Sequence, residues 1–334
     1  MTDNTWPTVD TELIDDVTLY SAKLIIPVTG PVIIDGAVAI HGDRVVHVGK
    51  RRWVLKALKQ EMTAHGTIHE RHWDGVLTPG LINAHTHLQY SGMVQVGQGT
   101  YDRFRAWELA FNEVYAEAQK TQPWKQWAED GARQMVESGT TAAADIVTDL
   151  DAAGALASQG MHGIAYWEVM GWHNAEWMEK GRTELIRQLR RMNEEQLPNL
   201  GISPHAPYTL ESEPFVDLPD IARQLNMRLH IHLAETPLEA GTYPPVLTTY
   251  SAADWSDHDW ESYRQLKEVG KGASAIQFVD QLGSLGPDVH IAHGVWANGE
   301  DRRILRQRGV GVALCPRSNR ITNTGKDAPV REYL

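Results

Sequence analysis

Cysteine and long apolar runs are nearly missing from this chain of 334 residues, and each shortage excludes a class of protein. The single cysteine, Cys315, excludes an internal disulfide framework and favours a reducing compartment. No stretch approaches the roughly 18 uninterrupted apolar residues of a membrane span. The polar, acidic start, residues 1–16, lacks the cationic and apolar regions of a signal peptide. We therefore expect a cytoplasmic protein.

Basic residues are also in short supply. The chain has 31 Lys and Arg against 43 Asp and Glu, a formal net charge of −12. This balance disfavours nucleic acid or an anionic membrane as a partner, so we expect a small-molecule substrate. A hydrophobic content of 42% is enough for a sizeable core. The oligomeric state stays open, with a homodimer as the default expectation.

The chain contains two segments with different secondary-structure patterns. Residues 1–75 contain short strand-like stretches, including 32–40 and 45–48 around a Gly-Asp turn, which predict a hairpin-rich β unit. Residues 76–334 alternate apolar strands with helical stretches, the pattern of βα units around a parallel sheet. The fold class is therefore α/β, a TIM-type barrel with a small β appendage. Seven barrel strands are predicted, near residues 78–88, 140–147, 163–169, 200–204, 228–233, 289–293 and 309–315.

The end of the first barrel strand carries the pair His85 and His87. Alternate residues of a strand point to the same face, so both imidazoles can reach one metal ion. The fifth strand repeats this spacing in His230 and His232, followed by Glu235 just beyond the strand end. We expect His232 to bind the metal and Glu235 to transfer protons, whereas His230, deeper in the strand, is interpreted as a core histidine.

Three further strand ends carry candidate groups. His293 ends the sixth strand and could be a ligand, a stabiliser of the reaction intermediate or a structural residue, while His290 is interpreted as packing. His205 lies between two prolines, which places it at the rim as a candidate substrate contact. Asn319 or Ser318 could face the site, with Asn319 as the candidate substrate contact, or both could belong to a simple turn. Cys315 is not expected to be a nucleophile.

These groups all lie at the carboxyl ends of strands, which converge on one mouth in a βα barrel. Neutral imidazoles with a nearby carboxylate suit Zn²⁺, with Fe²⁺ as an alternative. Residues 236–272, a long stretch after the fifth strand, are expected to form a substrate loop or lid. The sequence therefore predicts one divalent metal ion that activates water.

At this point the chain resembles the amidohydrolase superfamily, and within it the cytosine deaminase-like and adenosine-analogue deaminases that also include chlorohydrolases. The resemblance rests on five segments: residues 79–87, 203–207, 232–235, His293 and residues 315–319. It implies a (β/α)8 barrel with one metal ion. It further implies a role for each candidate. His85, His87 and His232 would be ligands, Glu235 the proton shuttle, and His293 a partner that polarises or positions the attacking water and the intermediate. His205 would contact the substrate.

In one respect the chain differs from the pattern of this superfamily. The superfamily places a metal-binding aspartate at the end of an eighth strand, and the chain ends before such a strand appears. Asp145, at the end of the second strand, is not its equivalent. The β unit looks like the first part of a small β-sandwich that these proteins complete with later residues. We therefore expect the 334 residues to be an N-terminal part of a longer protein.

Three functions remain open from the sequence. The first is deamination of a heteroaromatic amine, such as a purine or pyrimidine, by metal-activated water. The second keeps the same site but breaks another bond, in hydrolytic dechlorination or cleavage of a cyclic amide. The third is an inactive protein that only binds a metal or a partner.

Overall fold

The computed structural model describes residues 13–194, 197, 199–241 and 272–334. The chain divides into two units, residues 1–80 and 81–334. No helix among the described residues is long and apolar enough to cross a membrane. The stretch expected to form a lid, residues 236–272, lies mostly outside the described residues.

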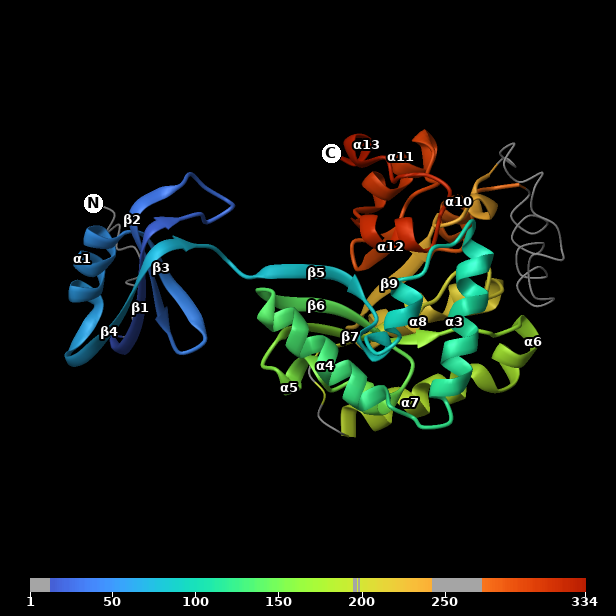
Figure 1. Cartoon of the computed structure of the whole chain (residues 1–334), viewed down its shortest axis with the longest axis horizontal. Helices are drawn as coiled ribbons and strands as arrows, with labels where there is room; N and C mark the ends of the chain where they lie inside the picture. The colour runs from blue at the N-terminus through green and yellow to red at the C-terminus, as the bar shows by residue number, and fades with distance from the viewer. Residues whose placement is uncertain (1–12, 195–196, 198, 242–271) are drawn as a thin grey trace, which may run out of the picture. The chain divides into compact units, whose positions relative to one another are not determined.

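The first unit is a four-stranded sheet with one helix. Its strands are β1 (Ile14–Ile25), β2 (Ile33–His41), β3 (Arg44–Lys50) and β4 (Met62–Leu77), and its helix is α1 (Arg51–Glu61) (Figure 1). The order is β3-β2-β1-β4, with β1 parallel to β4 and the other pairs antiparallel. The predicted hairpin is confirmed as β2 and β3, where Gly42 adopts a positive φ of 57° that glycine tolerates.

A small apolar core holds this unit together. Val17 and Leu19 lie two residues apart on β1 and so share a face, against which α1 packs Val54 and Leu58. The sequence did not predict α1 or the long strand β4. The described residues form one sheet here, and a second sheet of a β-sandwich is not among them.

The second unit contains seven parallel strands in sequential order. They are β5 (Leu81–Thr86), β6 (Thr140–Val147), β7 (His162–Val169), β8 (Leu200–Pro204), β9 (Arg228–Leu233), β10 (Val289–His293) and β11 (Gly311–Ala313). The predicted α/β barrel class and all seven strands are confirmed, four of them at the predicted bounds. The sheet curves into a nearly closed barrel, since the ring of His85 on β5 lies 5.4 Å from that of His293 on β10.

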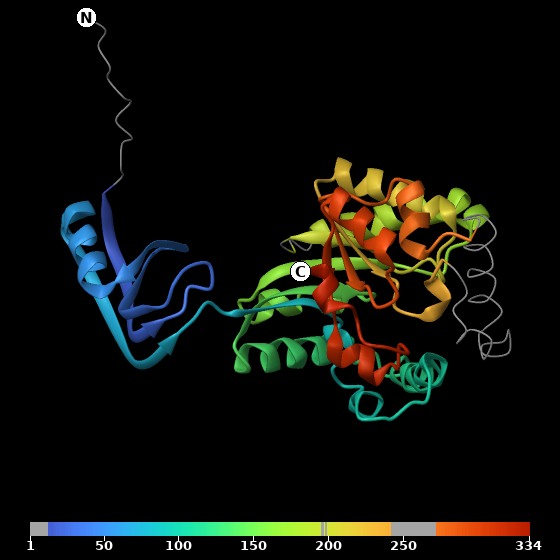
Figure 2. The same ribbon diagram turned by 90° about the horizontal axis from the view of Figure 1, so that it is seen from above.

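Helices connect the strands on the outside of the sheet (Figures 1 and 2). Helix α4 (Trp124–Glu137) precedes β6, and the helical stretch after β7 divides into α6 (Asn174–Glu176), a π-helical turn η3 (Trp177–Gly181) and α7 (Arg182–Glu194). The longer helices are α3 (Phe104–Ala118), α4 (Trp124–Glu137), α7 (Arg182–Glu194), α8 (Ser212–Gln224), α10 (Ala275–Gln281) and α11 (Gly299–Arg308). The short elements are η1 (Leu88–Tyr90), α2 (Val94–Gly97), η2 (Leu150–Ala152), α5 (Ala155–Ser158), α6 (Asn174–Glu176), η3 (Trp177–Gly181), η4 (Pro237–Glu239), α12 (Pro316–Ile321) and α13 (Val330–Tyr333).

The alternation of β9 shows how the barrel separates its core from its interior. Leu229, Ile231 and Leu233 are fully buried and belong to the main apolar cluster, which also contains residues of α7, α8 and α10. The intervening His230 and His232 point to the opposite face, the inside of the barrel. The strand pattern therefore places imidazoles at the centre of the unit.

The first unit offers a test of one charged contact. The Glu70 carboxylate accepts two hydrogen bonds of 2.6 Å from the Arg51 guanidinium and a third of 2.6 Å from Ser21 Oγ. We expect Glu70→Gln to destabilise this unit by about 1 kcal/mol, because the pair is charge-assisted but partly screened by solvent. Hydrogen–deuterium exchange at the amides of β1 and β4 measures the loss.

The same contact sets a pH dependence. The bonds from Arg51 lower the pKa of Glu70 from 4.5 to about 2. The stabilisation is therefore complete above pH 4.5 and lost as the pH falls through about 2. Asp74→Asn is the matched control, because the Lys23–Asp74 pair is 69% and 74% exposed. Equal exchange rates in the two variants would contradict the assignment.

Candidate metal centre

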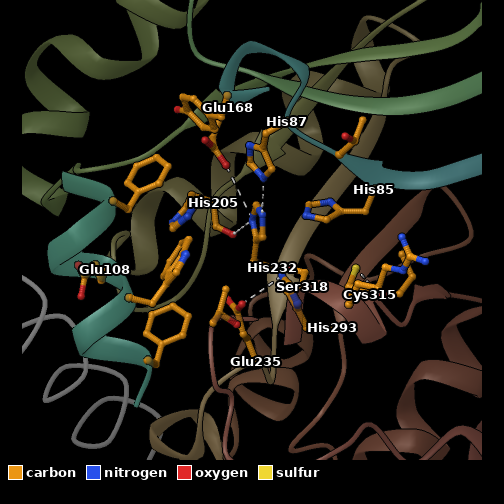
Figure 3. Close-up of a pocket in the computed structure, with 18 of the residues that line it drawn as sticks. His85, His87, Glu108, Glu168, His205, His232, Glu235, His293, Cys315 and Ser318 are labelled. Carbon is orange, nitrogen blue, oxygen red and sulfur yellow. Dashed lines mark hydrogen bonds and ion pairs between the residues drawn. The ribbon is translucent and has the colours of Figure 1, made fainter. Parts of the chain in front are cut away.

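Three imidazoles from two strands converge inside the barrel. His85 lies on β5, His87 follows that strand directly, and His232 comes from β9; their nearest ring nitrogens lie within 4.8 Å of one another. Figure 3 shows the three rings pointing toward a common space. Among the described residues this is one of two groups that could hold a metal ion; the other combines Glu168, His205 and His232.

Hydrogen bonds determine which nitrogen of His232 faces the centre. Its Nδ1 lies 3.1 Å from the carbonyl oxygen of His205, which can only accept, so Nδ1 carries the proton. Its Nε2 is left as a lone pair and lies 3.3 Å from His87 Nε2. The other nitrogen of His87, Nδ1, is buried with no hydrogen-bond partner. Together with His85, these two nitrogens lie close enough to bind one cation.

Burial keeps these rings neutral. Desolvation lowers the pKa of His85 and His232 well below the usual value and that of His87 to about 3. A neutral imidazole offers one lone pair, which is the form that binds a metal. The three residues therefore fit a divalent ion such as zinc in both position and protonation.

Glu235 and His293 lie beside the three rings. The closest approach is 3.4 Å, between Glu235 Oε1 and His293 Nε2 (Figure 3). Burial raises the pKa of Glu235 to about 8, so its carboxyl group holds a proton at neutral pH. The site thus contains a proton donor next to an imidazole acceptor.

A buried carboxylate fixes the turn that presents Glu235. Glu239, in η4, accepts hydrogen bonds from three successive backbone amides, those of Ala234, Glu235 and Thr236, at 2.8 to 2.9 Å. Ala234 has a positive φ of 54°, which turns the chain away from the strand direction. The sequence analysis missed Glu239, although a Glu three residues after Thr236 follows the pattern of a capping box.

The direction of His293 depends on its backbone. His290 pairs in register with His230, so both face the barrel interior, and strict alternation would then point His293 outward. His293 instead has a positive φ of 76°, and its ring enters the cavity. This conformation is costly for a residue other than glycine, so its presence marks a functional position.

Asn319, from α12, holds His293 rather than lining the cavity. Its Oδ1 lies 2.8 Å from His293 Nδ1, and its Nδ2 donates a 2.7 Å bond to the Leu314 carbonyl. The amide orientation is therefore fixed, His293 Nδ1 carries the proton, and His293 Nε2 is an acceptor. Both ends of Asn319 are engaged in these contacts, whereas its neighbour Ser318 lines the cavity.

His205 lies at the opposite wall from His293. Its Nδ1 contacts Thr209 Oγ1 at 2.7 Å, and that hydroxyl group donates to the Ala206 carbonyl, so Nδ1 donates and Nε2 is left as an acceptor. Glu168, at the end of β7, was not predicted as a site residue. It is buried, and its Oε1 has no hydrogen-bond partner and lies 3.8 Å from His232 Nδ1. The signal for Glu168 was a single carboxylate in an otherwise apolar strand.

The cavity above these groups has a volume of about 780 Å³ and an aromatic wall. Phe104, Trp107 and Phe111 line it at spacings of three and four residues, which is one face of helix α3. Glu108 lies on the same face and pairs with Arg105 at 2.7 Å. The sequence analysis did not predict this wall. Flat rings on one side and imidazoles on the other suit a planar aromatic substrate.

Asp145 and Cys315 have other roles in this geometry. Asp145 Oδ1 accepts a 2.9 Å bond from the Leu88 amide directly after the His85/His87 pair, so it supports that turn. Cys315 lines the cavity, and burial raises the pKa of its thiol to about 11. A thiol with that pKa is a poor nucleophile, as expected from the sequence.

Comparison with known proteins gives relatives along most of the chain. It is 29% identical over 322 residues to a 5-methylthioadenosine/S-adenosylhomocysteine deaminase of Moorella thermoacetica, an alignment that covers 93% of this chain and 65% of that protein. It is 29% identical over 265 residues to a 5'-deoxyadenosine deaminase of Methanopyrus kandleri, covering 78% of this chain and 54% of the relative. The chain thus spans between half and two thirds of the length of these relatives.

The fold is shared with solved structures. An adenosine deaminase from Xanthomonas campestris with bound zinc superposes with a TM-score of 0.70 at 20% identity, covering 96% of this chain and 67% of the other. A profile of the amidohydrolase family matches residues 76–243, half of the chain. The resemblance inferred from the sequence motifs is confirmed, and the chain belongs to the amidohydrolase family.

Proposed function

We propose that this chain is a metal-dependent hydrolase that removes the amino group from a heteroaromatic ring. The observation that carries the proposal is the convergence of His85, His87 and His232 beside the buried Glu235, in a cavity with an aromatic wall. The named activities of the relatives favour an adenosine-like nucleoside as the ring to test first.

His85, His87 and His232 would hold one divalent metal ion, and three imidazole donors favour zinc over iron. When bound, the ion supplies the positive charge that makes water a nucleophile near neutral pH. Glu168 and His205, the other two members of the second ligand group, are assigned to the substrate side.

The protons move through Glu235 and His293. The oxygen of water bonds to the ring carbon that carries the amino group, and Glu235 gives its proton to a neighbouring ring nitrogen. His293 Nε2, held as an acceptor by Asn319, orients the attacking water by accepting a hydrogen bond from it. Glu235 then moves one proton of the added water to the amino nitrogen, the carbon–nitrogen bond breaks, and ammonia leaves. The remaining hydroxyl proton returns to Glu235 as the ring carbonyl group forms.

The cavity wall would position the substrate. Trp107 and Phe111 offer flat apolar faces for the ring. His205 Nε2 presents an acceptor at the cavity, so it suits a donor group on the substrate. We assign Asn319 to the support of His293, in place of the direct substrate contact expected from the sequence.

A substrate panel tests the function. The full chain, loaded with zinc, is incubated with adenosine, 5'-deoxyadenosine, 5'-methylthioadenosine and a chloro-substituted triazine. We expect ammonia release from at least one nucleoside, measured by a coupled assay. Chloride release without ammonia would favour the dechlorination alternative, and bound zinc without any product would favour the inactive metal-binding alternative.

The first variant prediction concerns the proton shuttle. Glu235→Gln keeps the side-chain shape but removes the transferable proton, so we expect turnover to fall about 10²–10⁴-fold. Zinc content, measured by elemental analysis of the purified protein, should stay at the wild-type value. Wild-type turnover in this variant would remove Glu235 from the mechanism.

The second variant prediction concerns the ligands. His85→Ala removes one of three donors, and we expect the protein to lose stoichiometric zinc binding in a titration against a competing chelator. His173→Ala is the control, because His173 lies outside the proposed ligand set and bonds Glu211. Unchanged zinc stoichiometry in His85→Ala would contradict the proposed centre.

A further inference from the structure

His230 has a contact that a core histidine does not need. Its ring is fully buried, and its Nε2 lies 2.9 Å from Nδ1 of His85, the first proposed ligand. The two rings are inclined by only 6°, with centroids 5.0 Å apart. Nearly parallel rings joined nitrogen to nitrogen at this distance are linked by an N–H···N hydrogen bond.

Either imidazole can be the donor in this bond, and the choice decides whether Nε2 of His85 can bind a metal ion. A neutral imidazole has one N–H and one lone pair, so only one of the two rings can donate in this bond. If His230 donates, His85 accepts at Nδ1 and carries its own proton on Nε2, which then cannot bind a cation. If His85 donates from Nδ1, its Nε2 is the lone pair.

We propose that His230 is a positioning residue that accepts the Nδ1 proton of His85 and holds that ring with Nε2 presented to the metal ion. The inference rests on the proposed metal centre and adds the group that orients one of its ligands. Such supporting hydrogen bonds orient ligands and increase their basicity in metal sites generally.

This arrangement has a cost that makes it testable. With Nε2 as the acceptor, His230 carries its proton on Nδ1, which is buried and has no hydrogen-bond partner. An unsatisfied buried polar group destabilises the folded protein. If His230 served packing alone, nothing would compensate for this unpaired N–H group. Replacing His230 by an apolar ring removes the unpaired group, so the metal-free protein should be as stable as the wild type or more stable.

His290 provides a matched control. It pairs in register with His230 on the neighbouring strand and faces the same interior, with its ring centroid 6.3 Å from that of His230. It is half-buried, and within the part of the chain that the structure describes, neither a hydrogen bond nor a ring contact joins it to the three proposed ligands. His230→Phe and His290→Phe therefore remove similar rings from neighbouring positions, and only the first removes the bond to His85.

The experiment compares zinc affinity with stability in the full chain. We expect His230→Phe to weaken zinc binding about 10- to 100-fold in chelator competition, with a metal-free melting temperature equal to or above the wild-type value. His290→Phe should bind zinc as the wild type does. His230→Gln, whose amide oxygen can replace the acceptor, should recover most of the lost affinity.

Wild-type zinc affinity in a folded His230→Phe variant would overturn the inference, as would an equal loss in His290→Phe. If His230→Phe does not fold, the wild-type protein decides the question. Nitrogen NMR of the histidine-labelled, zinc-loaded chain should show the His85 proton on Nδ1, and a proton on Nε2 would overturn the inference. A wild type that binds no zinc contradicts the metal centre itself, whereas wild-type binding without deamination contradicts only the proposed function.

Discussion

The burial of neutral imidazoles inside the barrel is the constraint on which the site depends. Each buried ring has one N–H that needs an acceptor and one lone pair that needs a donor or a cation. The Nδ1–H groups of His232 and His293 donate hydrogen bonds outside the cavity, to the His205 carbonyl and the Asn319 amide oxygen respectively. The lone pairs on their Nε2 atoms therefore point into the cavity. The hydrogen bonds of His232 and His293 thus determine which of their ring nitrogens face the site.

The part of the site that follows strand alternation was predictable from the sequence. His85 and His87, and likewise His232, lie at strand ends where the two-residue period of a strand determines the face. A different pattern predicted the seven strands, because buried parallel strands are continuous apolar runs bounded by turn residues. His293, predicted at the site from its place at a strand end, reaches the cavity by another route, because its positive φ reverses the side-chain direction that strict alternation would give. No pattern in the neighbouring residues predicts that conformation for a histidine.

Contacts between distant segments were beyond the sequence for a different reason. Asn319 follows His293 by 26 residues, and its role becomes visible only when α12 packs behind β10. Helix α3 carries aromatic residues at helical spacing, a pattern that core packing produces equally well. The candidate residues at the strand ends could be predicted from the sequence. The residues that position them, such as Asn319, and the helix that forms the cavity wall became apparent only in the tertiary structure.

This division between strands and connecting segments bears on specificity. The groups proposed to bind the metal and transfer protons lie on strands or within two residues of a strand end, next to backbone that sheet hydrogen bonds hold. The wall that faces them comes from α3, which is tied to the barrel by side-chain packing and by few backbone bonds. Substitutions at Trp107 or Phe111 can therefore change the accepted ring while the ligand geometry is retained. A family with one metal centre can acquire different substrates in this way, because the two sets of residues are anchored by independent interactions.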